Sequence, residues 1–117
     1  YIHRGRFDWA LVDRIEEPGS VQQRLYDAIQ RLEEIRRAEA VFDADAEMSV
    51  VGYSDPSVLW IRRRAGEKTL HAVFNFSDER RTLWMPERGE YTDLVTGERD
   101  EFETFELAAW DFRWWLR

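Results

Sequence analysis

Residues 20–37 read SVQQRLYDAIQRLEEIRR, and this stretch divides the chain into two kinds of structure. Its apolar residues recur every three or four positions, which is the period of a helix with one apolar stripe. The residues of this stripe are Val21, Leu25, Ala28, Ile29, Leu32 and Ile35. Ser20 is a helix-capping residue and Gln23 stands three positions later, as in a capping box. We therefore expect one long helix, preceded by an aromatic loop and followed by short strands.

After this helix the hydrophobic period changes to two, which indicates β-strands. Residues such as Pro86 and Gly97 supply turn signals between the segments, and we expect Pro86–Gly89 to be a turn that separates two strands. The predicted strands are Glu47–Tyr53, Ser57–Arg64, Thr69–Phe76, Arg80–Met85, Glu90–Val95, Glu101–Glu106 and Ala109–Leu116. Six or seven short strands spaced by turns predict a mainly β fold, an antiparallel sandwich or barrel.

Composition excludes several classes of protein. The chain has 117 residues and a formal net charge of −7, which argues against binding to nucleic acid because such binding depends on a basic surface. It has no cysteine, so it has neither a disulfide nor a thiolate metal site. No apolar run approaches the ~20 residues needed to span a bilayer. The absence of cysteine favours a cytoplasmic location, and a start at Tyr1 in loop-like sequence suggests a piece of a longer protein.

The residues alone do not define an active site. The two histidines, His3 and His71, stand apart, and His71 alternates with apolar residues in a predicted strand, which is typical of a structural histidine. No group of His, Asp and Glu has metal-ligand spacing. Carboxylate pairs such as Asp100/Glu101 are numerous among the 24 acidic residues, and nothing in the sequence selects one of them for acid–base chemistry.

Tryptophan offers a second kind of candidate. Five of the six tryptophans fall in predicted strands: Trp60, Trp84, Trp110, Trp114 and Trp115. A tryptophan buries a large area, so filling the core is the ordinary interpretation, whereas an exposed flat ring can stack on a sugar. Trp115 alternates with the face of Trp110, Phe112, Trp114 and Leu116. We therefore expect Trp115 to be exposed, and it is the candidate for stacking on sugar.

Several segments together resemble a known family. YIHRGRFDW (residues 1–9) resembles the W-x-HRP-x-x-DW segment after the eighth barrel strand of the α-amylase superfamily, glycoside hydrolase family 13. Residues 20–42 resemble the last barrel helix, and HAVFNFSDE, YTDLVTGE and LAAWDFRWWL resemble segments of the family's C-terminal domain, domain C. The segments occur in the family's order, and His3-Arg4 with Asp8-Trp9 resemble the sucrose-acting, amylosucrase-type branch most closely.

The resemblance implies a division of the chain and a place for its function. Residues 1–19 would be the loop after the last barrel strand, 20–37 the last barrel helix and 46–117 a Greek-key β-sandwich of domain-C type. The catalytic aspartates and glutamate of the family would all lie upstream of Tyr1, so this chain alone would not be an enzyme, although its parent would be. The residues at the rim of the substrate pocket would be His3, Arg4, Arg6 and Asp8. The parent reaction, retaining glucosyl transfer or hydrolysis with sucrose as donor, needs no cofactor.

These observations leave more than one function open. The chain is a structural end-piece that stabilises the catalytic (β/α)8 barrel of the same polypeptide, or it is an α-glucan-binding module that uses exposed tryptophans. A third reading is an unrelated β-sandwich interaction domain. Separated from a barrel, the apolar helix stripe would be exposed, and we expect the isolated chain to self-associate through the helix and the aromatic N-terminal loop.

Overall fold

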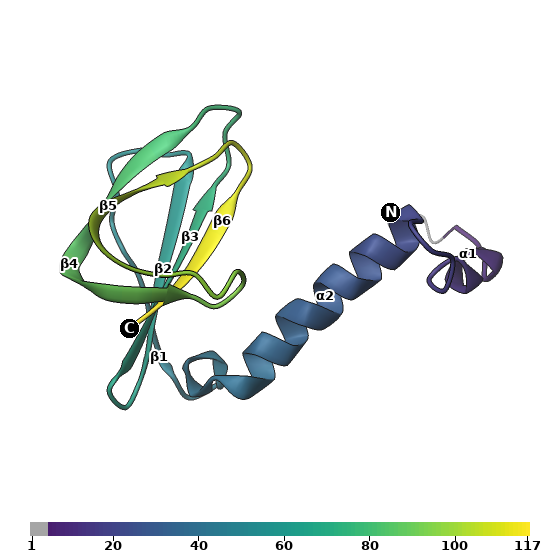
Figure 1. The fold of residues 1–117 in the computed structure, drawn as a ribbon, viewed down its shortest axis with the longest axis horizontal. Coiled ribbons are helices and arrows are strands. Elements are labelled where there is room, and N and C mark those ends of the chain that lie inside the picture. Colours follow the sequence, from purple (N-terminus) through teal and green to yellow (C-terminus); the bar gives the residue numbers. More distant parts are fainter. Residues whose placement is uncertain (1–4) are drawn as a thin grey trace. The chain divides into compact units, whose positions relative to one another are not determined.

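The computed structural model describes residues 5–117 (Figure 1). The chain divides into two compact units, Tyr1–Glu34 and Ile35–Arg117. The helical elements are α1 (Ala10–Asp13), α2 (Val21–Ala38) and the 3-10 turn η1 (Ala40–Phe42), and the strands are β1 (Glu47–Val50), β2 (Val58–Ala65), β3 (Lys68–Asn75), β4 (Arg81–Asp93), β5 (Arg99–Leu107) and β6 (Phe112–Leu116). The predicted long helix and the change to strands after it are confirmed.

The start of α2 is fixed by a reciprocal cap. Ser20 Oγ accepts a hydrogen bond from the backbone N–H of Gln23 at 3.0 Å, and Gln23 Oε1 accepts one from the N–H of Gly19 at 2.8 Å. Two backbone donors that a helix start leaves unpaired are thus satisfied. Arg36 and Arg37 lie in the last turn, where the helix dipole favours cations.

Most of the apolar stripe of α2 is exposed. Ile29 is 60% exposed, and Val21 and Leu25 are exposed to a similar degree, whereas Ile35 near the end of the helix is buried. In unit Tyr1–Glu34, α1 and the first turns of α2 also line an apolar pocket of about 290 Å³. Its lining residues are Phe7, Leu11, Val12, Ile15, Gln22 and Tyr26.

The strands form one six-stranded sheet in the order β1-β2-β3-β6-β4-β5, with every neighbouring pair antiparallel. The antiparallel, mainly β prediction is confirmed. A sandwich of two separate sheets and a Greek-key topology are not confirmed, because hydrogen bonds continue through the whole series of strands. The sheet has two halves, β1-β2-β3-β6 and β4-β5. The pairing that joins them is short, because β4 pairs with β6 only at Thr92–Leu116 and Asp93–Trp115.

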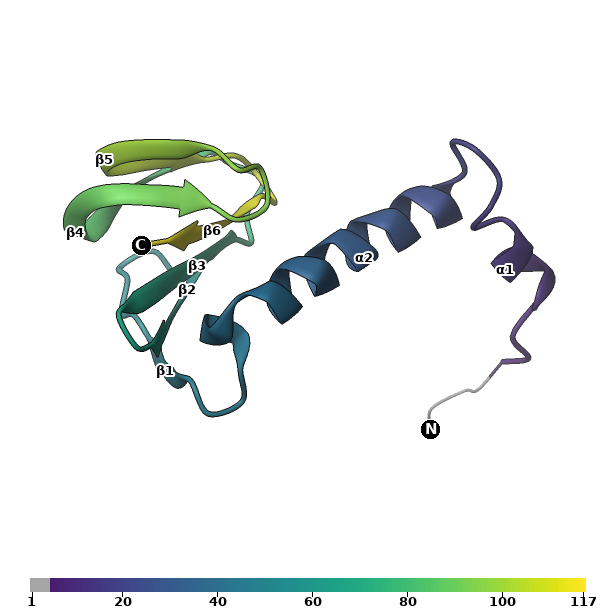
Figure 2. The same cartoon turned by 60° about the horizontal axis from the view of Figure 1, so that its bottom comes forward.

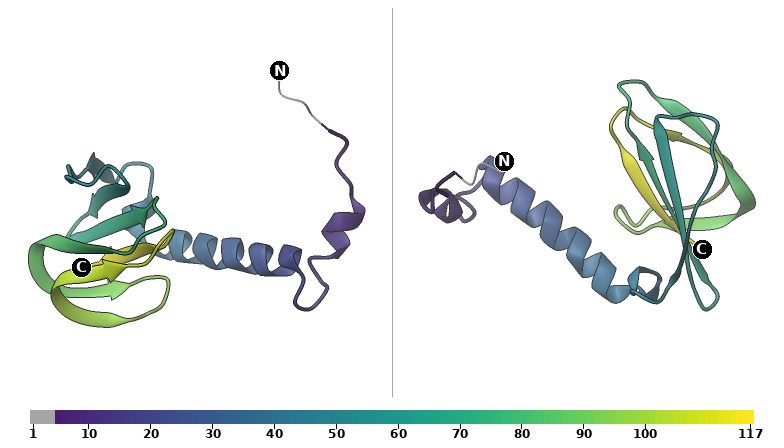
Figure 3. Two further views of the ribbon diagram at one scale, coloured as in Figure 1. Left: turned by 90° about the horizontal axis from the view of Figure 1, so that it is seen from above. Right: turned by 180° about the vertical axis from the view of Figure 1, so that it is seen from behind.

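The sheet curls so that its two halves enclose one core. Strands β2 and β5 stand far apart in the strand order, yet the rings of Trp60 and Phe105 lie 6.0 Å apart, and those of His71 on β3 and Tyr91 on β4 lie 5.9 Å apart. The ribbon shows β4 and β5 folded over the other half (Figures 2 and 3). The core consists of Trp60, Val73, Leu83, Met85, Tyr91, Phe105, Leu107 and Trp115.

The expected turn at Pro86–Gly89 is wrong, because β4 runs without interruption through these residues. The register against β5 shifts between Trp84 and Gly89, so the extra residues form an irregularity of the strand instead of ending it. Tyr91 Oη donates a hydrogen bond to the carbonyl of Glu87 at 2.6 Å, and Arg117 Nη1 lies 2.7 Å from Glu87 Oε2. These contacts hold the irregular segment against the end of β6.

The turn between β4 and β5 explains the YTDLVTGE segment. Asp93 is fully buried, and its carboxylate accepts hydrogen bonds from the N–H of Val95 and the hydroxyl of Thr96, both at 3.1 Å. Gly97 has a φ of 78°, a conformation that glycine adopts without a steric penalty. Asp93, Thr96 and Gly97 of this segment therefore each have a local structural reason.

Leu83→Ala tests the position of the core. Leu83 is 1% exposed, so we expect the change to lower the free energy of unfolding by about 2–5 kcal/mol through lost burial and a cavity. Leu59→Ala is the matched control, because Leu59 is 37% exposed and its loss should cost under about 1 kcal/mol. Urea unfolding followed by fluorescence measures both, and equal losses would place the core elsewhere.

Candidate functional site

The predicted pocket-rim residues fall in the N-terminal unit. His3 and Arg4 lie outside the described residues. Arg6 and Asp8 are exposed, and Asp8 Oδ1 accepts a hydrogen bond from the N–H of Ala10 at 3.0 Å, at the start of α1. Asp8 thus has a local role in ending the loop and starting a helical turn. A role at the rim of a substrate pocket stays a prediction for all four residues.

The expectation that Trp115 is exposed is wrong. Trp115 is 4% exposed and packs between the rings of Phe102 at 4.7 Å and Phe105 at 5.9 Å. Its strand, β6, lies inside the sheet between β3 and β4, so both of its faces are covered. One face belongs to the core, and on the other Trp114 packs against Phe42 of η1 at 4.9 Å. Trp115 is therefore not a stacking surface for a sugar.

The exposed tryptophans of the sheet unit are different ones. Trp84 lies on β4 and Trp110 precedes β6, and both are largely exposed, whereas Trp60 and Trp114 are buried. The prediction that Trp110 lies in a strand is wrong. It has a φ of 58°, and its N–H donates to the carbonyl of Ser77 at 3.0 Å. The strand begins only after this turn, at Phe112.

His71 is a structural histidine of the core. Its Nδ1 accepts a hydrogen bond from Trp60 Nε1 at 3.1 Å, and its ring packs edge-on against Tyr91. Burial lowers the pKa of His71 to about 4; Glu87 opposes this shift, while nearby arginines strengthen it. The ring is neutral at physiological pH, and the accepted hydrogen bond fixes which nitrogen carries the proton.

The side chain of Asn75 joins three segments of the sheet unit through hydrogen bonds. Its Nδ2 donates to the carbonyls of Glu79 at 2.8 Å and Ala108 at 2.9 Å. Its Oδ1 accepts from the N–H and the hydroxyl of Ser77 at 3.1 and 2.7 Å. The Asn-Phe-Ser sequence therefore closes the turn after β3 and anchors the connection between β5 and β6.

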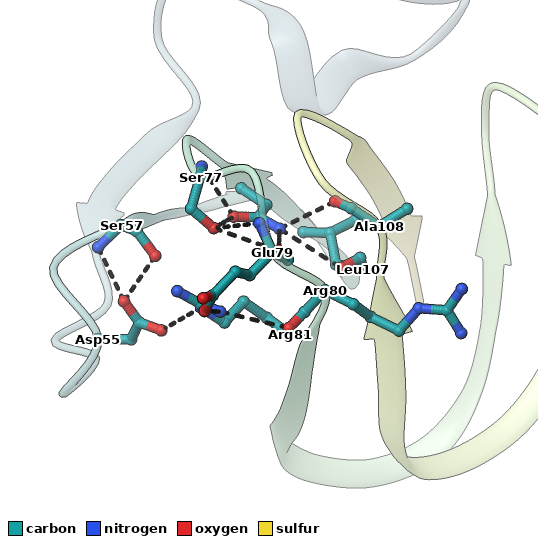
Figure 4. Close-up of polar contacts among 9 residues, drawn as sticks. Asp55, Ser57, Ser77, Glu79, Arg80, Arg81, Leu107 and Ala108 are labelled. Carbon is teal, nitrogen blue, oxygen red and sulfur yellow. Dashed lines mark hydrogen bonds and ion pairs between the residues drawn. The ribbon is translucent and has the colours of Figure 1, made fainter.

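A salt-bridge cluster lies beside the Asn75 contacts. Arg81 stands between Asp55 and Glu79, each 2.7 Å away. The Asp55 carboxylate also accepts two hydrogen bonds from Ser57, and these bonds are the main reason why its pKa is lowered. The hydroxyl of Ser57 donates to Asp55 (Figure 4), and that of Ser77 donates to Asn75, so both hydroxyls are held in structural contacts.

Within residues 5–117, no group of three or more His, Asp and Glu side chains is arranged to hold a metal ion. No helix in that range is long and apolar enough to cross a membrane.

The outer side of β1, β2, β3 and β6 is an apolar surface. Directly paired residues of antiparallel strands share a face, and the register joins Val50 with Ile61, and Leu59 with Phe74 and Phe112. We call this surface the apolar sheet face: Met48, Val50, Leu59, Ile61, Phe74, Phe76 and Phe112. The rings of Phe76, Phe74 and Phe112 are stacked in a row at 6.2 and 5.9 Å. Val50 is 68% exposed, and Met48 and Phe76 are exposed to a similar degree.

A pocket of about 220 Å³ lies between β5 and β6, and sequence reasoning did not find it. Aromatic rings of the core and charged side chains line it together: Glu98, Asp100, Phe102, Thr104, Phe105, Glu106, Arg113 and Trp115. The carboxylate of Asp100 was one of many in the sequence. Only the curl of the sheet brings β5 beside Trp115 and Arg113, so spacing along the chain carried no signal for this group.

Solved structures of carbohydrate-acting proteins have a similar fold. This chain is similar to AmyP in complex with maltose (TM-score 0.71, 17% identity, 81% of this chain and 20% of that one). It is similar to an Anoxybacillus α-amylase, with a TM-score of 0.68 and 17% identity over 80% of this chain and 22% of that one. It is also similar to the trehalulose synthase MutB from Pseudomonas mesoacidophila MX-45, with a TM-score of 0.70 and 19% identity over 91% of this chain and 19% of that one. The chain spans about a fifth of the length of these proteins. The resemblance to the α-amylase superfamily is thereby confirmed as a likeness of fold.

A family model also matches the strands of the sheet unit. Together with the similar solved structures, it defines the class as a β-domain of carbohydrate-acting enzymes. The model described as β-galactosidase C-terminal domain matches residues 58–116, half of the chain. The chain belongs to the β-galactosidase C-terminal domain family. Among curated proteins, none matches the sequence.

The buried His71 predicts a loss of stability in acid. As pH falls below about 6.5 the unfolded chain binds a proton at this residue, while the folded chain does not until about pH 4. The free energy of unfolding should therefore fall by about 3 kcal/mol across this interval from His71 alone. Urea unfolding of the wild type and of His71→Gln, which keeps an acceptor for Trp60, measures the difference. Parallel pH profiles of the two proteins would contradict it.

Asn75→Asp should destabilise the fold strongly. The change replaces two amide donors by a carboxylate that faces the carbonyls of Glu79 and Ala108, and we expect a cost of about 3 kcal/mol. Ser57→Ala removes one hydroxyl contact with Asp55 and should cost about 1 kcal/mol. Thermal and urea unfolding at pH 7 compare the two variants. Equal costs would mean that Asn75 does not hold the turn.

Proposed function

We propose that this chain is the non-catalytic C-terminal region of an α-amylase-family enzyme, and that it stabilises the catalytic (β/α)8 barrel of the same polypeptide. The observation that carries the proposal is the apolar sheet face. An apolar face that is buried in a core needs no further explanation. A contiguous apolar surface that is exposed, as this one is, marks a contact with another protein body. Two further findings support a large partner in the same polypeptide. The family match is to the C-terminal domain of an enzyme, and the similar structures are about five times as long as this chain.

The N-terminal unit supports the same proposal. The exposed stripe of α2 and the apolar pocket beside α1 are surfaces that a barrel would cover. In this proposal residues 1–19 are the loop after the last barrel strand, 20–37 are the last barrel helix and 46–117 are the domain of domain-C, sandwich type. A loop after the eighth strand lies on the face of a barrel where active sites are built. His3, Arg4, Arg6 and Asp8 would then stand at the substrate-pocket rim.

The proposed activity of the parent enzyme is inferred from the sequence of residues 1–9. The likeness of residues 1–9 to the amylosucrase-type branch supports α-glucosides as substrates and sucrose as donor. The reaction would be retaining transfer of glucose to a glucan or to water, with catalytic carboxylates in the barrel upstream. The described residues contribute buried structural polar groups and apolar surfaces, which suits a supporting role.

The proposal predicts that the isolated chain self-associates. The apolar sheet face and the α2 stripe lose their cover without a barrel, so we expect the average mass in light scattering to rise from micromolar to millimolar protein. Val50→Lys with Phe76→Ser on the sheet, or Leu25→Lys with Ile29→Lys on the helix, should lower it. These side chains are exposed, so the variants should fold.

Trp84→Ser is the matched control for self-association. Trp84 is also a large exposed apolar residue, but it lies on β4, outside the apolar sheet face. This variant should associate like the wild type. A wild-type chain that remains a monomer at millimolar concentration would overturn the proposal that these surfaces normally contact another body.

A further inference from the structure

We propose that the exposed indole of Trp84 is a stacking platform for one ring of a neutral oligosaccharide. Trp84 lies in the long strand β4 between two core residues, Leu83 and Met85, so the alternation of a strand points its side chain away from the core. The residue is 64% exposed. This role is separate from the proposed docking role, because Trp84 does not belong to the apolar sheet face.

The docking role does not account for this exposed ring. Within residues 35–117, six large apolar residues are exposed. Four of them belong to the apolar sheet face, and the other two are Trp84 and Trp110. Because the inner faces of both halves of the sheet enclose one core, their outer faces point away from each other (Figure 2). A body docked on the apolar sheet face would therefore leave Trp84 open to solvent.

Hydroxyl groups flank the indole. The register pairs Trp84 with Thr104 on β5, and directly paired residues share a face with their Cβ atoms about 5 Å apart. Thr82 stands two residues earlier on the same face of β4, opposite Glu106. A sugar ring stacked on the indole would bring its hydroxyls to the hydroxyls of Thr104 and Thr82, which both donate and accept hydrogen bonds.

A bulge follows directly after Trp84 and fixes its strand. The register against β5 shifts between Trp84 and Gly89, and Glu87 inside the shifted segment is held by Tyr91 and Arg117. Bulges re-aim side chains and are common beside functional sites. The indole is thus presented from the last regular pair of a rigid strand, so little conformational freedom is lost when a ligand binds.

The surroundings of the indole select the chemistry of the ligand. Charged side chains of the β4–β5 hairpin are paired, Arg80 with Glu106 at 2.8 Å and Arg88 with Glu103 at 3.2 Å. This pairing and the net charge of −7 disfavour a phosphate or a nucleic acid. One ring among polar groups is also too small a surface for a stable protein interface, which buries about 1,200–2,000 Å². A sugar ring has an apolar C–H face for the indole and hydroxyls at its rim for the polar neighbours.

The test follows the six indole resonances of the ¹⁵N-labelled chain during titration with maltoheptaose, a neutral chain of glucose rings. Trp84→Phe removes one resonance and thereby identifies that of Trp84. We expect this resonance to shift saturably at millimolar sugar, while that of the equally exposed Trp110 stays in place. A Trp84 resonance that moves with protein concentration and not with sugar would assign the indole to a protein contact and overturn the proposal.

Variants separate stacking from an indirect effect, with ligand-observed NMR of maltoheptaose as the measurement. Trp84→Ala should raise the dissociation constant about tenfold or more, whereas Trp84→Tyr, which keeps a stacking ring, should retain most of the affinity. Trp110→Gly is the matched control, because it removes another exposed indole and suits the φ of 58°. No saturable shift in the wild type, unchanged affinity in Trp84→Ala, equal losses in Trp84→Ala and Trp84→Tyr, or lost binding in Trp110→Gly would each overturn the proposal.

Discussion

The short pairing of β4 with β6 at Thr92 and Asp93 is the constraint on which the sheet unit depends. Two residue pairs join the β4–β5 hairpin to the four other strands, so the hairpin can fold over them while the sheet stays continuous. The buried carboxylate of Asp93 holds the turn that follows, and Tyr91, two residues earlier, enters the core. One junction thereby sets the curl, the core and the place of the β4–β5 turn.

Because the sheet curls, its inner face is buried and much of its outer face stays exposed. The inner face is closed by the hairpin and contains the buried aromatic cluster, with the neutral His71 bonded to Trp60. On the outer face, η1 covers Trp114, and the stacked row of Phe76, Phe74 and Phe112 continues beyond it. A domain with a complete core of its own and a second apolar face is suited to stand against a larger body. This is the basis of the proposed supporting role.

The same curl places polar and aromatic groups from distant segments in one pocket. Charged residues of β5 meet the inner residues of β6, Arg113 and Trp115, where the hairpin edge approaches the strand.

The sequence by itself determined the local structure, because the signals for it lie within a few residues. The period and cap of Ser20–Arg37 predicted α2, and alternation with turn residues predicted most strands and the family likeness. Tertiary structure decided burial and strand pairing. Alternation correctly set Trp115 opposite Trp114, but only the strand order buries both faces of β6. Likewise Pro86–Gly89 has turn chemistry, yet contacts of Tyr91 and Arg117 with Glu87 keep β4 continuous. The Arg117–Glu87 contact joins residues 30 positions apart, and no short-range pattern encodes it.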